Sequence, residues 1–156
     1  MRLLVTGGRH LDDVALINTA LNRTHSFRPI SVLIHGGHAL LGVAAEDWAR
    51  ERDVHILRYP ANWRLHGKRA EGIRNAFMLS DSRPDMVLAL PGGADSRALV
   101  LSAVARGLAV LDHRGQRLAP TRSSRLHEAD PEPEPAMPCM TGAPEAPRPC
   151  SRAPAL

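Results

Sequence analysis

Three pairs of glycines each follow a short apolar run, and they are the feature of this sequence that points most directly to chemistry. The pairs are Gly7-Gly8, Gly36-Gly37 and Gly92-Gly93. Because glycine has no Cβ, backbone N–H groups at such a pair can approach a phosphate closely, and the N-terminus of a following helix adds partial positive charge. Arg9 follows the first pair, and its guanidinium is a planar fork suited to phosphate. The pattern predicts a site for a phosphate-bearing ligand.

Further polar residues, near the third pair and in one predicted helix, extend the candidate site. They are Lys68, Arg74, Asn75, Asp95 and Ser96. Two interpretations of the basic residues in this helix stay open. They would neutralise a bound phosphate, or they would lie on a solvent-exposed face, which is the more common case for a helix with several arginines. Trp63 follows another apolar run, and two interpretations of it stay open: stacking on a base, or packing beneath a loop.

A catalytic role would need a general acid or base in the same loops. The side chains available are Asp95, His10, His35, His38 and His66. Nothing in their spacing places two of them within hydrogen-bond reach of each other. His35 and His38 lack a carboxylate or thiol at a matching distance, so we predict no metal and no cofactor. The chain matches none of the GxGxxG, P-loop, Ser-His-Asp and GxSxG patterns.

Alternating strand and helix patterns must position these residues. Apolar runs predict strands at Leu3–Thr6, Ser31–His35, His55–Tyr59, Met86–Leu90 and Leu108–Asp112. Apolar residues at three- and four-residue steps predict helices at Asp12–Thr24, Leu40–Arg52, Gly67–Ser80 and from Ser96 to Gly107. We expect Ala70, Ile73 and Phe77 to form the apolar face of the third helix, with Phe27 and Tyr59 also in the core.

This alternation predicts a doubly wound α/β fold. The expected architecture is Rossmann-like, with three α/β/α layers around a five-stranded, mainly parallel sheet of order 3-2-1-4-5. Parallel strands end at one edge of the sheet, the carboxyl edge, where open α/β sheets bind their ligands. The glycine pairs should therefore meet at this edge.

The composition changes sharply near Pro120. Nine of the 13 prolines fall in residues 120–156, whereas 11 of the 12 glycines precede them. A segment with so much proline and no apolar periodicity buries too little surface to offset the entropy of its chain. We predict a ligand-binding domain at residues 1–118 and a disordered Pro-rich tail at residues 119–156.

The charge and the amino-acid composition limit the classes of binding partner that we expect for this protein. The net charge is +4, and 19 of the 20 basic residues are arginines, which indicates either anionic partners or a codon bias. Aromatic residues make up only 3% of the chain, which disfavours nucleic-acid binding by base stacking. The apolar run at the N-terminus is too short for a signal peptide or a membrane span, so we expect a cytoplasmic protein without a membrane partner. A homo-oligomer is left open.

The motifs in this order resemble the YspA, cpYpsA-related branch of the SLOG superfamily. The segments that carry the resemblance are Leu4–Arg9, Leu33–Gly37, Trp48-Ala49, Tyr59–Trp63, Gly67-Lys68, Ile73–Asn75, Met78, Pro84-Asp85 and Pro91–Gly93. SLOG groups Rossmann-like domains with the LOG phosphoribohydrolases and the DNA-processing protein DprA. The resemblance implies a nucleotide-derived ligand at the carboxyl edge and, for most members of this branch, no established reaction.

Two departures from the family pattern bear on function. The family usually has Arg-Gly-Ala-Asp where this chain has Ala39–Gly42, and Gly-Thr where it has Asp95-Ser96. The Asp95 carboxylate would either cap the following helix or compete with a bound phosphate. LOG enzymes also have a glutamate just after this motif, at positions that here are Ala98 and Leu99.

Three functions follow from these residues. The first is binding of a nucleotide or nucleotide-derived ligand by a sensor or accessory domain. The alternative is a nucleotide-processing hydrolase similar to the phosphoribohydrolases. Single-stranded nucleic-acid binding, as in DprA, is the least favoured because so few aromatic side chains are available for stacking.

Overall fold

The computed structural model describes residues 1–118 of the 156-residue chain. The predicted Pro-rich tail at 119–156 lies outside the described residues. The strands are β1 (Arg2–Thr6), β2 (Val32–His35), β3 (His55–Arg58), β4 (Met86–Ala89) and β5 (Ala109–Asp112). The helices are α1 (Val14–Phe27), α2 (Ala39–Arg50), α3 (Trp63–His66), the 3-10 turn η1 (Gly67–Arg69), α4 (Ala70–Asp81) and α5 (Ala94–Ala105).

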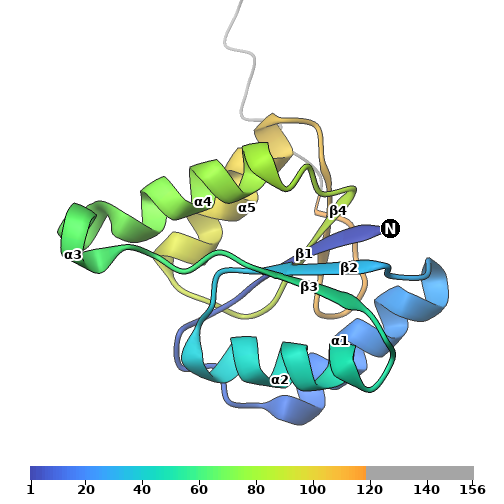
Figure 1. Cartoon of the computed structure of the whole chain (residues 1–156). Coiled ribbons are helices and arrows are strands. Elements are labelled where there is room, and N and C mark those ends of the chain that lie inside the picture. Colours follow the sequence, from blue (N-terminus) through green and yellow to red (C-terminus); the bar gives the residue numbers. More distant parts are fainter. Residues whose placement is uncertain (119–156) are drawn as a thin grey trace, which may run out of the picture. The chain divides into compact units, whose positions relative to one another are not determined.

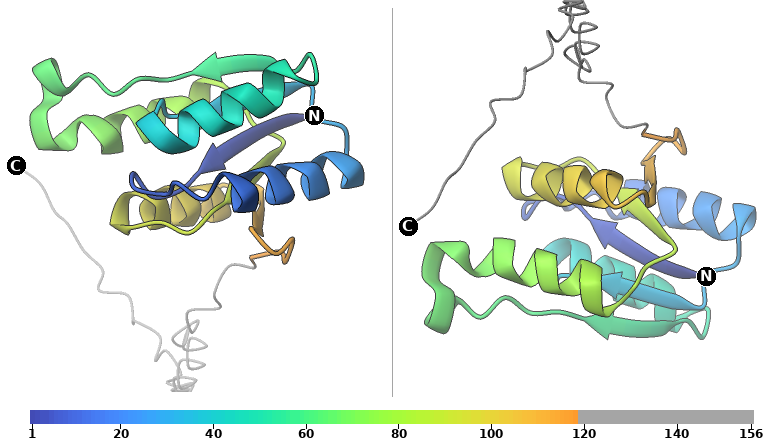
Figure 2. Two further views of the ribbon diagram at one scale, coloured as in Figure 1. Left: turned by 90° about the horizontal axis from the view of Figure 1, so that it is seen from below. Right: turned by 90° about the horizontal axis from the view of Figure 1, so that it is seen from above.

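The five strands form one parallel sheet of order β3-β2-β1-β4-β5, which confirms the predicted Rossmann-like fold. Helices α1 and α2 cover one face of the sheet, and α4 and α5 cover the other (Figure 1). Figure 2 shows the same two layers from below and from above. The central strand β1 pairs through Leu4 with Ile34 on one side and with Val87 on the other.

The apolar run of β1 is explained by burial on both faces. Leu3 and Val5 belong to the core cluster under α1 and α2, whereas Leu4 belongs to the cluster under α4 and α5. All three side chains are at most 1% exposed. A parallel strand covered on both faces needs apolar residues at successive positions, and alternation would leave one face polar.

The apolar face predicted for α4 is wrong. Ala70 is buried as expected, but Ile73 is 45% exposed and Phe77 is 57% exposed. The buried side instead includes Glu71, Arg74, Asn75, Met78 and Leu79. Glu71 and Arg74, on the first turns of this side, lie over the carboxyl edge of the sheet. There Glu71 binds Arg9 and Arg74 binds backbone carbonyls. Of the predicted core aromatics, Phe27 is also exposed, whereas Tyr59 packs against the cluster under α4 and α5.

Local capping explains where two helices begin. Helix α1 starts at Val14 because the carboxylate of Asp13 accepts a hydrogen bond from the Leu16 N–H at 2.8 Å. Helix α5 starts at Ala94, before the predicted Ser96, with Gly93 as its N-cap. Among the described residues, no helix combines the length and hydropathy needed to cross a membrane.

Candidate functional site

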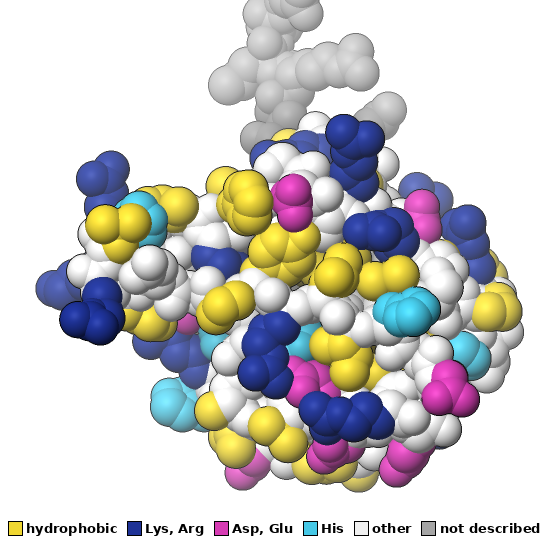
Figure 3. Space-filling model, in the orientation of Figure 1, with side chains coloured by type: hydrophobic (Ala, Val, Ile, Leu, Met, Phe, Trp, Pro, Cys, Tyr) yellow, Lys and Arg dark blue, Asp and Glu magenta, His cyan; other side chains and the backbone are white. Residues whose placement is uncertain are grey.

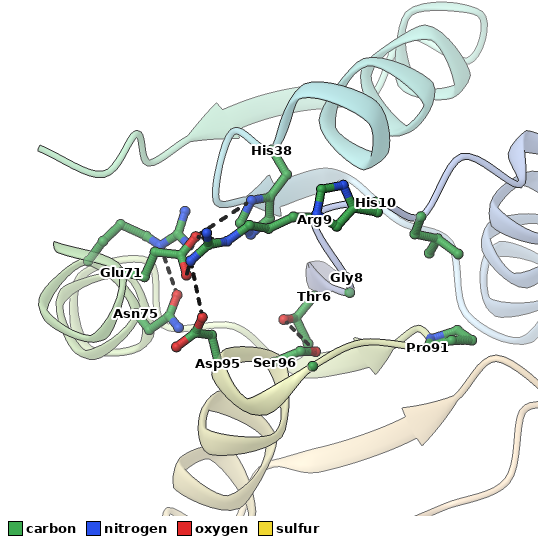
Figure 4. Close-up of a pocket in the computed structure, with 14 residues that line it drawn as sticks. Thr6, Gly8, Arg9, His10, His38, Glu71, Asn75, Pro91, Asp95 and Ser96 are labelled. Carbon is green, nitrogen blue, oxygen red and sulfur yellow. Dashed lines mark hydrogen bonds and ion pairs between the residues drawn. The ribbon is translucent and has the colours of Figure 1, made fainter. Parts of the chain in front are cut away.

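A cavity of about 420 Å³ opens at the carboxyl edge, where the loops after β1 and β4 meet α4 and α5. We call it the main cavity. Eight of the predicted site residues line it: Gly7, Gly8, Arg9, Arg74, Asn75, Gly93, Asp95 and Ser96. Thr6, His10, Leu11, His38, Glu71 and Pro91 complete the lining. The lining residues come from β1, α4 and α5 and from the loops after β1, β2 and β4 (Figure 4).

An adjoining cavity of about 310 Å³ lies beside the loops after β2 and β3. Gly36 and Gly37 line this cavity, together with Trp63, and not the main one. The two cavities share Arg9, His38, Glu71 and Arg74 in their walls. Lys68 lies in η1, outside the linings of both cavities.

The floor of the main cavity is formed where the loops after β1 and β4 touch. The Gly8 N–H donates to the carbonyl of Pro91 at 2.8 Å, and the hydroxyls of Thr6 and Ser96 lie 3.2 Å apart. A Cβ on Gly92 would come within 2.7 Å of the Gly8 backbone nitrogen. Gly92 is therefore required for the close approach of the two loops, and it lies behind the lining rather than in it.

Arg9 reaches across the boundary between the cavities. Its Nε and Nη2 atoms donate to the two carboxylate oxygens of Glu71 at 3.1 and 2.7 Å, and Nη2 also lies 3.4 Å from Asp95. The Glu71 side chain is only 4% exposed. Such a bidentate pair fixes the plane of the guanidinium as well as its position. Arg9 therefore already has two carboxyl partners within the chain.

The pKa values of the neighbouring carboxyls of Glu71 and Asp95 are shifted in opposite directions. Burial opposes ionisation of Glu71, but hydrogen bonds from Arg9 and Asp95 outweigh it and lower the Glu71 pKa. The pKa of Asp95 is raised, first by its hydrogen bond to Glu71 and then by burial and the nearby negative charge. The same contact between the two carboxyls therefore favours the ionised form of Glu71 and the protonated form of Asp95.

Arg74 holds two loops together. Its guanidinium donates to the carbonyls of Gly36 and Tyr59 and to the side-chain oxygen of Asn75. The residue is 7% exposed, and a Cβ on Gly36 would overlap the guanidinium. Arg74 therefore positions the loops after β2 and β3, and it also lines both cavities, where its predicted contact with a phosphate stays a prediction.

The histidines fall into different environments. His10 and His38 line the main cavity, and burial followed by the positive charge of Arg74 lowers the pKa of His38. His35 is buried, with its Nε2 3.1 Å from Glu46 Oε1 but out of hydrogen-bond alignment. Neither His35 nor His66 lines either cavity. Within residues 1–118, no group of three or more His, Cys, Asp or Glu side chains is placed to hold a metal ion.

Glu71 in the cavity lining and Glu46 beside His35 are two charged residues that the sequence analysis missed. Glu71 precedes Arg74 and Asn75 by three and four residues, which places all three on one face of α4. That spacing was a usable signal once Arg74 and Asn75 were assigned to the site. Glu46 has no comparable signal, because its partners His35 and Arg58 belong to other elements.

Comparison with known proteins identifies a related family. The model of the YspA, cpYpsA-related SLOG family matches residues 1–66. The resemblance to this family is confirmed. These residues contain β1 to β3, the first two glycine pairs and Trp63. No curated protein matches the chain. The family match suggests a role in binding or processing a nucleotide-related ligand.

The two departures from the SLOG pattern lie in different structural settings. Ala39–Gly42 forms the first turn of α2, where Leu41 is buried in the core and Gly42 packs against the His35 ring. Asp95 does not cap α5 as expected, since Gly93 is the N-cap and no side chain bonds there. Its carboxylate faces Arg9 instead (Figure 4). The Asp, Glu and Arg side chains that line the main cavity are therefore those of Arg9, Glu71, Arg74 and Asp95.

Proposed function

We propose that the protein binds a phosphate-bearing, nucleotide-derived ligand in the main cavity, as a sensor or accessory domain. The observation that carries this proposal is the meeting of the loops after β1 and β4 with the N-terminus of α5 at one cavity. The first N–H groups of a helix have no partners within it, and no side chain caps α5. Those N–H groups, with the Gly7–Arg9 loop, form the phosphate site.

Arg9 and Asp95 have opposite roles in this site. Arg9 is the cation of the main cavity that is exposed enough to meet a ligand, with 54% of its side chain accessible. Asp95 sits in the first turn of α5, where its carboxylate repels a phosphate and engages the arginine that would neutralise it. Phosphate must therefore compete with Asp95 and Glu71 for Arg9.

Substitution of these two residues should change affinity in opposite directions. Arg9→Ala is expected to weaken binding of a nucleoside monophosphate about tenfold or more, because a charge-assisted contact is lost. Asp95→Asn should tighten it about two- to fivefold, because repulsion at the helix terminus is removed. Calorimetric titration at fixed salt measures both.

The ligand for these titrations comes from a thermal-shift screen of nucleotides, nucleotide sugars and ADP-ribose. A ligand at about 100 times its Kd stabilises the fold by about 2.7 kcal/mol. Arg97→Ala is the matched control, because Arg97 is an exposed arginine of α5 outside the cavity lining. If Arg9→Ala and Arg97→Ala weaken ligand binding equally, the loss of affinity would come from the change in net charge and not from a contact made by Arg9. The absence of any stabilising phosphate compound would refute the proposal.

A second candidate function is hydrolysis of a bond in the nucleotide. The favouring observation is the pair of neighbouring carboxyls whose pKa values are shifted in opposite directions, lowered for Glu71 and raised for Asp95. Two neighbouring carboxyls in different environments can act as a base and an acid at one site. Release of free base from AMP, abolished by both Glu71→Gln and Asp95→Asn but kept in Arg97→Ala, would favour the hydrolase. Intact AMP after prolonged incubation would rule out this reaction on AMP.

A further inference from the structure

The indole of Trp63 is exposed in a chain that has only two tryptophans. Its relative exposure is 47%, whereas the other tryptophan, Trp48, is 2% exposed and belongs to the core. Trp63 is in neither core cluster. Basic and apolar side chains gather at the end of the domain that carries α3 (Figure 3). An exposed indole gives up burial energy, so a packing role does not explain its position.

The loop that carries Trp63 is held in place by hydrogen bonds. The side-chain oxygen of Asn62 accepts from the Leu65 N–H at 3.1 Å and caps α3. The Tyr59 N–H donates to the carbonyl of His35 at 2.9 Å, and Arg74 donates to the Tyr59 carbonyl at 3.2 Å. The indole is therefore presented on a fixed backbone, so that little further ordering is needed on binding.

Trp63 lines the adjoining cavity together with the backbone of Gly36 and Gly37, which bring no side chains into it. Arg9 connects this cavity to the main cavity. Its guanidinium carbon is 5.3 Å from the centre of the indole ring, while its nitrogens bind Glu71. A ligand whose phosphate contacts Arg9 therefore has the aromatic surface of Trp63 close to that contact.

We propose that the adjoining cavity is a nucleobase subsite, in which the base of the ligand stacks on Trp63 while its phosphate occupies the main cavity. This inference rests on the proposed function and specifies its ligand as a nucleotide with an intact base. A base–aromatic stack tolerates any base, because each has a π face, so AMP serves as the probe. Ribose 5-phosphate is the matching probe without a base.

Titration of two variants with these two probes tests the subsite. Trp63→Ala should weaken AMP binding about 5- to 100-fold, the range for loss of one base stack, and change ribose 5-phosphate binding less than about twofold. Trp63→Phe should recover most of the AMP affinity, because the aromatic surface is kept. Leu65→Ala is the matched control, since Leu65 is 71% exposed on the same short helix.

Fluorescence gives a readout that a purely structural role of Trp63 would not produce. AMP should quench the emission of the exposed indole, ribose 5-phosphate should not, and Trp63→Phe should remove the quenching because only buried Trp48 remains. Equal weakening of both probes by Trp63→Ala would show that Trp63 acts through Arg9 and would overturn the subsite. Unchanged AMP affinity in Trp63→Ala would also overturn it. Failure of both probes to bind the wild-type protein would instead count against the proposed function itself.

Discussion

Gly92→Ala is expected to lower the free energy of unfolding by about 1–3 kcal/mol, the usual cost of forcing an extra methyl group into close-packed structure. The new Cβ would lie 2.7 Å from the backbone nitrogen of Gly8, 2.9 Å from the carbonyl carbon of Gly7 and 2.8 Å from the Cβ of Ser96. Two of these three neighbours are backbone, so relief requires the loops after β1 and β4 to separate. That movement breaks the hydrogen bond from Gly8 to Pro91 and deforms the main cavity.

The adjacent glycine supplies the control. A Cβ on Gly93 meets nothing within 4 Å, and its φ of −85° suits any residue. Gly93→Ala should therefore stay within about 0.5 kcal/mol of the wild type, because the small capping loss and the reduced entropy of the unfolded chain offset each other. Urea unfolding measures both variants. Equal stabilities for the two variants would show that the loops after β1 and β4 accommodate a Cβ on Gly92 without separating.

The fold was predictable from the sequence because the apolar runs of its strands indicate burial on both faces of the sheet. Successive apolar residues, such as Leu3, Leu4 and Val5, leave no polar face, which indicates a parallel strand covered on both sides. Right-handed crossovers then place helices on both faces of the sheet, and the parallel strands place the first and third glycine pairs at one edge. The helical turn at Trp63–His66 was missed, since four residues are too few for a periodic pattern.

The site was only partly predictable because helix analysis assumes that the polar face meets solvent. In α4 the apolar residues Ile73 and Phe77 are exposed, while Glu71 and Arg74 are buried where the helix meets the carboxyl edge. Their partners are Arg9, far away in the sequence, and backbone carbonyls, which have no sequence signature. The role of Arg74 in joining loops, and the engagement of Arg9 by two carboxyls, became visible only with the fold.

Glu46 and His35 are a second case in which buried polar residues have partners that the sequence does not reveal. His35 ends β2 and is 1% exposed, and Glu46 of α2, at 4%, receives hydrogen bonds from Arg50 and Arg58. Burial, assisted by the positive charge of Arg58, lowers the pKa of His35 to about 4, although the charge of Glu46 opposes this shift. His35 is therefore a neutral buried imidazole near neutral pH, and it must gain a proton when the chain unfolds below its ordinary pKa.

Stability should consequently fall as the solution becomes mildly acidic. The unfolded chain binds a proton at His35 below its ordinary pKa of 6.5, whereas the folded chain does so only near 4. Between pH 7 and pH 5 this difference removes about 2 kcal/mol from the free energy of unfolding, and urea unfolding at a series of pH values measures it. His35→Gln, which does not titrate, should reduce the dependence in this window and leave the part that comes from His38, whose pKa is also lowered. His55→Gln, at an exposed position, should keep the wild-type slope. Stability that rises toward pH 5 would mean that attraction between an imidazolium and Glu46 outweighs burial.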